Sequence, residues 1–200
     1  MERSNQLPSY QHNDYIIILN PKEELQSRIL TIKESFKEKY KTEVYVTKPY
    51  ITLVKFSSLQ ITEDKLVHEL QKIGNNRDPF KIDLRDYGSY PTHSIFINII
   101  TKNAIHELIK DLKKIRYLMK TANHDPYFIT EPNINIALKL LPWQYEKAWL
   151  EYSYTAFSGS FMADEMILLR KKEGDTKYKA VCRLGFMYIP EKIAQGNLFI

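Results

Sequence analysis

Cysteine is almost absent from this sequence. Cys182 is the single cysteine in 200 residues, which excludes an internal disulfide framework and any multi-cysteine metal site. A lone thiol suits a reducing compartment, and a small buried side chain is its simplest interpretation. We therefore expect a cytoplasmic protein that holds no metal and no cofactor.

Long hydrophobic runs are missing as well. Stretches such as "IIIL" at 16–19 are the longest aliphatic runs, and they are far too short to cross a bilayer. The start of the chain, "MERSNQLPSYQHND", has no apolar segment of the kind found in a secretory signal peptide. These observations predict a soluble protein with no membrane partner.

Several motifs of large enzyme families do not occur. The sequence has no glycine-rich phosphate loop, no His-x-x-x-His zinc spacing and no Gly-x-Ser-x-Gly turn. The sequence therefore gives no support for assigning the chain to the nucleoside triphosphatases, the zinc hydrolases or the α/β-hydrolases.

Charge of one sign is only slightly in excess. The chain has 29 basic and 24 acidic residues, a formal net charge of +5. This balance permits a polyanionic partner without requiring one, since nucleic-acid-binding proteins usually concentrate positive charge on one face. We interpret the lysine-rich clusters at 37–41, 110–120 and 170–179 as solvated faces of two helices and a turn.

The chain does contain a regular alternation of predicted strands and helices. Apolar and alternating patterns predict strands at 14–21, 43–46, 48–56, 80–88, 94–100, 133–140, 159–172 and 178–186. Helical spacing predicts helices at 22–41, 61–76, 103–120 and 142–156, the second with Thr62 as its N-cap. We predict one α+β domain over residues 1–200, with lobes at about 14–120 and 121–200 and strand exchange between them left open.

Two of the predicted strands begin alike. "PYITL" (49–53) and "PNINI" (132–136) each place polar side chains first and third after a proline. Because side chains alternate between the faces of a strand, Tyr50 and Thr52 share one face, and Asn133 and Asn135 share one face of the later strand. The opposite faces then carry Ile51, Leu53 and Lys55 in the first strand, and Ile134, Ile136, Leu138 and Leu140 in the second. An ordinary strand with a half-buried tyrosine also explains the first stretch.

These openings resemble the motifs of the two-histidine phosphoesterases, a group that contains 2′-5′ RNA ligase-like proteins and cyclic phosphodiesterases. Motif strands of that family begin Pro-His-x-Thr-aliphatic, and the order of elements and the closing "DEMILLRKKEGDTKYKAV" hairpin are also similar, over about residues 14–186. The resemblance implies an α+β fold whose two lobes are related by a pseudo-twofold, with antiparallel sheets around a central cleft and helices outside. It also implies that both motif strands lie side by side at the bottom of the cleft and direct four side chains at one phosphate.

Both motif histidines are replaced in this sequence. The resemblance aligns them with Tyr50 and Asn133, and aligns the second Thr or Ser with Asn135, so only Thr52 is kept. Imidazole exchanges protons near neutral pH, whereas tyrosine, with a pKa of about 10, stays protonated and asparagine does not titrate. We therefore assign no catalytic residue and leave open whether the protein is an enzyme. These four side chains are the predicted ligand-binding positions, where hydroxyls and carboxamides can hold a phosphate, ribose or base edge.

Three functions remain open at this stage. The first is a non-catalytic module that binds a phosphate ester, a nucleotide or an RNA end. The second is an active RNA or cyclic-nucleotide phosphodiesterase that uses displaced residues, with His93 and His124 on the rim, although solvent-exposed loop histidines are the simpler interpretation. The third is a partner-binding scaffold with a filled cleft and with exposed aromatic residues in 142–157, where core packing is the competing interpretation. We expect a monomer.

Overall fold

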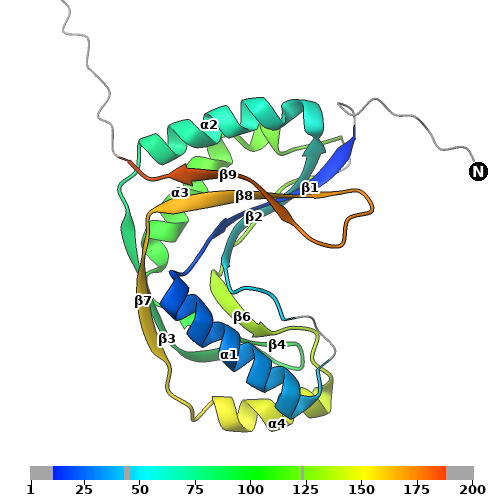
Figure 1. Cartoon of the computed structure of the whole chain (residues 1–200), viewed down its shortest axis with the longest axis vertical. Helices are drawn as coiled ribbons and strands as arrows, with labels where there is room; N and C mark the ends of the chain where they lie inside the picture. Colours follow the sequence, from blue (N-terminus) through cyan, green and yellow to red (C-terminus); the bar gives the residue numbers. More distant parts are fainter. Residues whose placement is uncertain (1–10, 43–45, 123, 188–200) are drawn as a thin grey trace, which may run out of the picture.

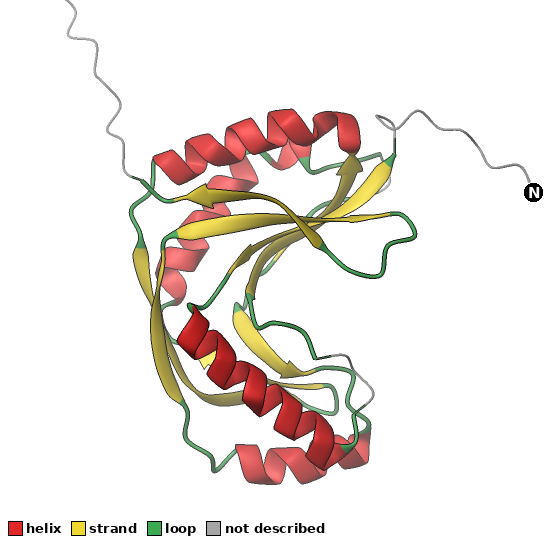
Figure 2. Cartoon of the chain, viewed as in Figure 1, coloured by secondary structure: helices red, strands yellow, loops and turns green. Residues whose placement is uncertain are grey.

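The computed structural model describes residues 11–42, 46–122 and 124–187. Two antiparallel sheets face each other across a cleft and helices cover their outer sides, which gives the C-shaped outline of Figures 1 and 2. The strands are β1 His12–Leu19, β2 Ile51–Leu59, β3 Phe80–Tyr90, β4 Ser94–Ile99, β5 Tyr127–Phe128, β6 Asn133–Ala137, β7 Ser158–Ala163, β8 Glu165–Lys172 and β9 Lys179–Gly185. The helices are α1 Glu23–Tyr40, α2 Glu63–Asn75, α3 Lys102–Lys114 and α4 Pro142–Tyr152. The predicted α+β fold with antiparallel sheets around a cleft is confirmed.

The two sheets have the same internal order. One runs β5-β2-β1-β8-β9 and the other β6-β4-β3-β7, so that β2-β1-β8-β9 matches β6-β4-β3-β7 strand by strand. Along the chain, β1-α1-β2-α2-β3 is matched by β4-α3-β6-α4-β8, with β5 inserted before β6 and β7 inserted before β8. A pseudo-twofold therefore relates the sheets, and the repeat divides between β3 and β4.

The sheets do not correspond to the predicted lobes at 14–120 and 121–200. Each sheet takes strands from both parts of the chain. The helices are exchanged too, because α1 follows β1 but packs on β6 of the other sheet, and α3 follows β4 but packs on β2. Neither sheet can therefore form its core from a continuous piece of chain.

The predicted strand at 159–172 is wrong as a single element. Its first part, β7, pairs with β3, and its second part, β8, pairs with β1 in the other sheet. The chain crosses between the sheets at Asp164, whose carboxylate pairs with Lys22 at 2.5 Å and whose backbone oxygen accepts a hydrogen bond from Phe186 N. No glycine or proline marks this crossing, so the turn signals that end most strands are missing.

Other predicted boundaries are corrected in detail. Helix α3 ends at Lys114 instead of continuing to 120, and a 3₁₀ turn, Arg116–Leu118, follows it. Thr62 does stand at the N-cap of α2, but its hydroxyl donates to the backbone oxygen of Leu59 and caps no helical N–H group. Most of the predicted strand at 43–46 lies outside the described residues, and β5 is not among the predicted strands.

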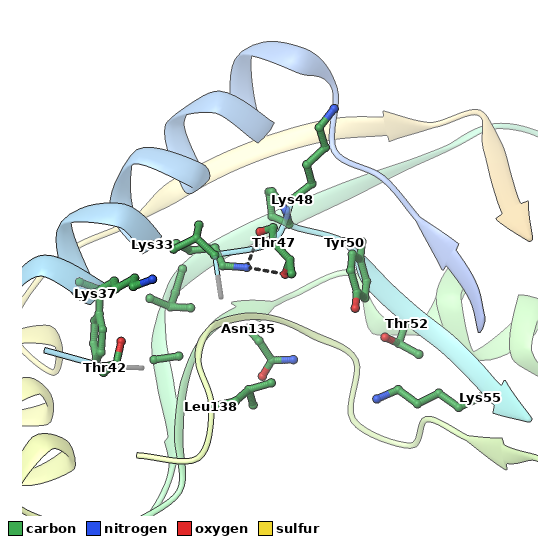
Figure 3. Close-up of a pocket in the computed structure, with 15 residues that line it drawn as sticks. Lys33, Lys37, Thr42, Thr47, Lys48, Tyr50, Thr52, Lys55, Asn135 and Leu138 are labelled. Atoms are coloured by element: carbon green, nitrogen blue, oxygen red, sulfur yellow. Dashed lines mark hydrogen bonds between the residues drawn. The ribbon is translucent and has the colours of Figure 1, made fainter. Parts of the chain in front are cut away.

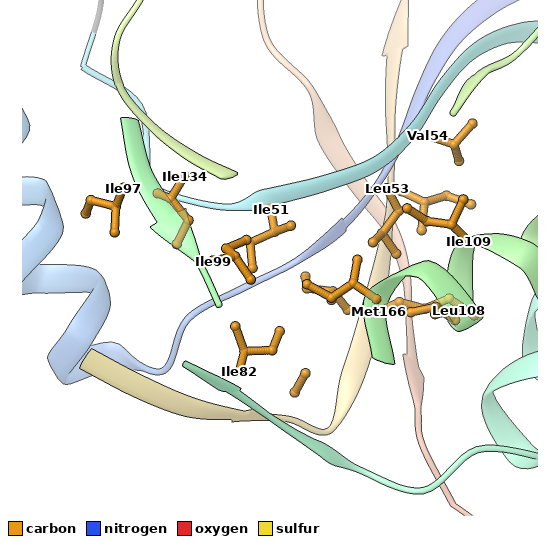
Figure 4. Close-up of a cluster of buried hydrophobic side chains, with 14 of the residues drawn as sticks. Ile51, Leu53, Val54, Ile82, Ile97, Ile99, Leu108, Ile109, Ile134 and Met166 are labelled. Carbon is orange, nitrogen blue, oxygen red and sulfur yellow. The ribbon is translucent and has the colours of Figure 1, made fainter. Parts of the chain in front are cut away.

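Buried aliphatic side chains from both sheets form one continuous core. Figure 4 shows its centre, where β2, β3, β4, β6, β8 and α3 contribute side chains. The labelled residues are Ile51, Leu53, Val54, Ile82, Ile97, Ile99, Leu108, Ile109, Ile134 and Met166. Each is at most 4% exposed, and full burial of such a side chain stabilises the fold by roughly 1.5–3 kcal/mol. Both motif strands are thus anchored from behind by their apolar faces.

Helix α2 approaches β9 closely at Gly74, and this contact gives a test of the packing. A methyl group at Gly74 would lie 2.7 Å from the backbone oxygen of Gly185, so Gly74→Ala should force α2 away from β9. We expect a loss of about 1–3 kcal/mol in the free energy of unfolding, measured by urea denaturation, despite the better helix propensity of alanine. Gly185→Ala, whose added methyl has no atom of the described residues within 4 Å, is the matched control. A Gly74→Ala variant as stable as the control would contradict the close approach of α2 to β9.

Candidate ligand-binding cleft

The two motif strands lie beside each other at the bottom of the cleft. Cα atoms of β2 and β6 come within 8 Å of each other, although each strand is hydrogen-bonded within its own sheet. Both strands line the same inner hollow and the same outer hollow. The side-by-side arrangement implied by the resemblance is therefore present.

A β-bulge in β2 changes which side chains face the cleft. The ladder to β1 pairs Ile17 with Val54 and Ile18 with Thr52, which leaves Leu53 as an extra residue. An extra residue shifts the alternation of all later side chains by one position. Lys55 therefore lines the cleft with Tyr50 and Thr52, and the prediction that it shares the opposite face with Ile51 is wrong.

A second bulge occupies the equivalent position in β6. The ladder to β4 pairs Phe96 with Asn135 and Ile95 with Ala137, which leaves Ile136 as the extra residue. Leu138, at 38% exposure, consequently lines the cleft with Asn135 instead of joining the core. The strand ends at Ala137, and Lys139 has a left-handed backbone with φ of 55°. The predicted strand to residue 140, with Leu138 on its buried face, is therefore wrong.

Four polar side chains converge on the inner hollow, a cavity of about 100 Å³. In Figure 3 the Tyr50 hydroxyl, the Thr52 hydroxyl, the Asn135 amide and the Lys55 ammonium group point toward a common space. None of the four makes a side-chain hydrogen bond or ion pair within the described part of the chain. These groups are therefore available to a ligand.

Lysines surround the same hollow. Its lining contains Lys33, Lys37, Lys48 and Lys55 and, among the described residues, no carboxylate. Lys33 is only 9% exposed, and its ammonium group donates to the backbone oxygen of Thr47 at 2.7 Å and to the Thr47 hydroxyl at 3.4 Å. Burial lowers the pKa of Lys33 to about 8. The described residues that line the hollow are thus basic or neutral.

This pocket was not predicted from the sequence. The lysines at 37–41 were interpreted as a solvated helix face, and neither Lys33 nor Lys48 was singled out. One signal was present, since Lys33 and Lys37 are four residues apart and so share one face of a helix. The surroundings of this helix face depend on the packing of α1 on the other sheet. Residue spacing alone does not reveal that packing.

The outer hollow, of about 350 Å³, continues from the inner one. It shares Thr52, Lys55, Asn135 and Leu138 with the inner hollow and adds Asn133, Tyr90, His93 and Tyr127. Asn133 donates an amide hydrogen bond to the backbone oxygen of Glu131 at 3.3 Å, and the Glu131 carboxylate pairs with Lys102 at 2.6 Å. Of the predicted site residues, Thr52 and Asn135 line both hollows, Tyr50 the inner and Asn133 the outer.

Tyr50 is half-buried against an apolar patch and does not close the cleft. Its ring packs on a cluster formed by Ile16, Ile18 and Ile167. Burial raises the pKa of the Tyr50 hydroxyl above its ordinary value of 10, so the group is protonated at neutral pH. It can donate a hydrogen bond to a ligand, but it cannot take a proton as a general base.

The two predicted rim histidines line different hollows. His93 is exposed in the turn before β4 and lines the outer hollow beside Asn133. His124 is also exposed, but it lines a separate hollow with His12 and Asp14. Only His93 therefore faces the motif residues. In the described ranges, no group of three or more His, Cys, Asp or Glu side chains is placed to hold a metal ion, and no helix is long and apolar enough to span a membrane.

The aromatic residues of α4 divide between core and surface. Trp143 is 52% exposed, whereas Tyr145 and Trp149 are half-buried and stack with their ring centroids 6.5 Å apart. Tyr152 packs against Phe36 with centroids 5.3 Å apart. Only some of the aromatic residues considered as a partner-binding surface are therefore exposed.

A sequence profile described as the 2′-5′ RNA ligase superfamily matches residues 21–175. The chain belongs to this superfamily. The matched range contains both motif strands and both bulges. A search of curated proteins gives no match.

Solved structures of the same fold include members with bound ligands. The protein TT0787 of Thermus thermophilus matches with a TM-score of 0.66 and 13% identity, over 88% of this chain and 98% of that chain. E. coli LigT complexed with 3′-AMP matches with a TM-score of 0.60 and 13% identity, over 88% and 99%. LigT complexed with ATP matches with a TM-score of 0.57 and 14% identity, over the same shares. Identities this low show a common fold.

The buried Lys33 of this superfamily member should cost stability in the absence of a ligand. The pKa of Lys33 is lower in the folded state than in the unfolded chain, so folding releases protons between about pH 8 and 10.5 and stability rises with pH there. Lys33→Met should therefore raise the free energy of unfolding by roughly 1–3 kcal/mol at pH 7, with the gain shrinking as the pH rises above 8. Denaturation at several pH values measures this, with the exposed Lys147→Met as control. A pH-independent difference would show that charge burial is not the cause.

Proposed function

We propose that this protein binds a phosphate ester, carried by a nucleotide or an RNA end, and that it does not turn the ligand over. The observation that carries this proposal is the convergence of Tyr50, Thr52, Asn135 and Lys55 on one hollow, without side-chain partners in the described chain. Polar groups that are left unpaired in a partly buried site cost free energy unless a ligand pairs with them. A ligand with several acceptor oxygens pairs with all four.

Charge favours a phosphate over a neutral ligand. Neutral donors alone bind phosphate weakly in water, whereas hydrogen bonds in which one partner is ionised are roughly twice as strong. Lys55, brought to this face by the bulge in β2, supplies such a charge beside Thr52 and Asn135. The E. coli LigT structures complexed with 3′-AMP, phosphate and ATP support a ligand of this class.

The outer hollow suits the organic part of the ligand. Tyr127 is 64% exposed on β5 and Tyr90 is 45% exposed at the end of β3, on opposite sheets. Exposed aromatic rings are platforms on which a base can stack, typically with about 1–3 kcal/mol per base. A nucleoside would lie between them with its phosphate toward Lys55.

The absence of turnover follows from the replaced histidines. A general acid or base supplies about 10²- to 10⁴-fold in rate. Asn133 cannot transfer a proton, and the pKa of Tyr50 is raised by burial, so neither side chain acts as an imidazole does near neutral pH.

Binding is predicted to depend on the motif side chains. Thr52→Val and Asn135→Leu should each weaken nucleotide binding by about 1 kcal/mol, and Lys55→Met should weaken it by about 1.5–3 kcal/mol, because its hydrogen bond is charge-assisted. Isothermal titration with 3′-AMP, cyclic nucleotides and short RNAs at low salt measures this, with the exposed Thr31→Val of α1 as control. For single-stranded RNA, log affinity should fall against log salt by about 0.7 for each phosphate neutralised. Equal affinity of parent and variants, or no binding at low salt, would exclude this function.

Hydrolysis of 2′,3′-cyclic nucleotides and of 2′-5′ linkages should be undetectable at micromolar concentrations of the protein. The Tyr50→His, Asn133→His double variant restores both imidazoles and should gain weak turnover, since Asn135 still lacks the usual hydroxyl. Activity of the parent protein that disappears in a His93→Ala, His124→Ala double variant would instead establish a phosphodiesterase that uses displaced residues.

A further inference from the structure

We propose, on the basis of the binding function above, that the cleft face of β3 and β4 is a subsite for the base of the ligand. The base stacks on the rings of Phe96 and Tyr90, and its polar edge pairs with the hydroxyl of Ser94. The ligand is then a nucleotide, and a sugar phosphate without a base binds more weakly.

Strand pairing places these side chains on the wall of the cleft. Asn135, which lines both hollows, is the cross-strand partner of Phe96, and residues that lie directly opposite each other share one face of a sheet. Phe96 is in turn opposite Gly88, and Ser94 is opposite Tyr90. Ser94 and Tyr90 also line the outer hollow. The proposed subsite therefore adjoins the motif position Asn135.

Gly88 allows the ring of Phe96 to lie over β3. A Cβ atom at Gly88 would be 2.5 Å from Cε2 and 2.9 Å from Cζ of Phe96, so the ring needs a glycine beneath it. The ring of Phe96 stays partly exposed, and its centroid is 4.9 Å from that of Tyr90, which is 45% exposed. Two neighbouring rings with free surface on the wall of a cleft are a platform on which a base can stack.

The pseudo-twofold gives each of these positions a counterpart on the other sheet. Phe96 corresponds to Ile18, because Phe96 pairs with the motif residue Asn135 as Ile18 pairs with Thr52. The counterparts of Ser94, Phe96, Gly88 and Tyr90 are, in this order, Ile16, Ile18, Ile167 and Leu169. These three isoleucines form one apolar cluster and are at most 4% exposed. At these positions, the cleft face of β3 and β4 offers rings where the other sheet is aliphatic and closed.

The hydroxyl of Ser94 gives an independent indication of a ligand at this face. The side chain is 1% exposed, and its Oγ atom has no hydrogen-bond partner among the described residues. A buried hydroxyl that is left unpaired costs free energy. The fold itself does not need a hydroxyl here, since the counterpart position is Ile16. The polar edge of a base would supply the missing partner.

The decisive measurement compares ligands with and without a base. Isothermal titration at constant ionic strength should show 5′-AMP binding about tenfold or more tightly than ribose 5-phosphate. Phe96→Leu removes the ring and keeps an apolar side chain, so it should bring this ratio close to one and leave the affinity for ribose 5-phosphate unchanged. Tyr154→Leu removes an 87% exposed ring beyond the end of α4 and is the matched control, in which the ratio should stay high.

Ser94→Ala tests the hydrogen bond and leaves the rings in place. It should lower the affinity for 5′-AMP about threefold or more, without changing the affinity for ribose 5-phosphate. Because the removed hydroxyl has no partner among the described residues, the variant should be at least as stable as the parent in urea denaturation. This variant therefore tests the subsite even if Phe96→Leu does not fold. An unchanged affinity of Ser94→Ala for 5′-AMP would overturn the role of Ser94.

The outcomes separate this subsite from the proposed function. Equal affinity for 5′-AMP and ribose 5-phosphate, with both bound, would overturn the base subsite and leave the binding of a phosphate ester standing. A ratio that stays high in Phe96→Leu, or that falls only in Tyr127→Leu on β5, would place the base elsewhere in the cleft and would also overturn the subsite. No binding of either ligand would overturn both proposals.

Discussion

In both motif strands the ladder of hydrogen bonds skips one residue, Leu53 in β2 and Ile136 in β6. The bulges sit one residue after Thr52 and Asn135, so each strand first presents its two motif positions to the cleft and then shifts its alternation. This shift brings Lys55 and Leu138 to the cleft. Without it, Lys55 would point into the apolar core and would not line the hollow.

The exchange of helices completes the site. Because α1 follows a strand of one sheet and packs on β6 of the other, its lysines stand opposite β2 across the inner hollow. The core behind the sheets holds both motif strands in place through residues such as Ile51 and Ile134. The cleft therefore depends on contacts between segments far apart in the chain, and a local defect in either repeat would alter it.

Much of this arrangement could be predicted from the pattern of residues. Alternation in "PYITL" and "PNINI" is enough to place Tyr50 and Thr52, and Asn133 and Asn135, on common faces, because these residues precede the bulges. The positions of Lys55 and Leu138 could not be predicted in this way, since a bulge of Leu53 or Ile136 leaves no mark in a run of aliphatic residues. The crossing at Asp164 was missed for a similar reason: it follows from pairing of β7 with β3 and of β8 with β1, strands that are far away in the sequence. The spacing of the lysines on α1 could be read from the sequence, but the surface that they face depends on the packing of α1 on the other sheet.

The backbone follows a pseudo-twofold, but the side chains at equivalent positions of the two motif strands differ. A cleft with identical halves would accept an elongated ligand in two opposite orientations. Here, hydroxyls stand on β2 where β6 has carboxamides, and the charged Lys55 stands where β6 has the apolar Leu138. The bulges place these unlike residues at corresponding points of the two strands. The two ends of the cleft therefore differ chemically, although the backbone is duplicated. An elongated ligand consequently has one preferred orientation in the cleft.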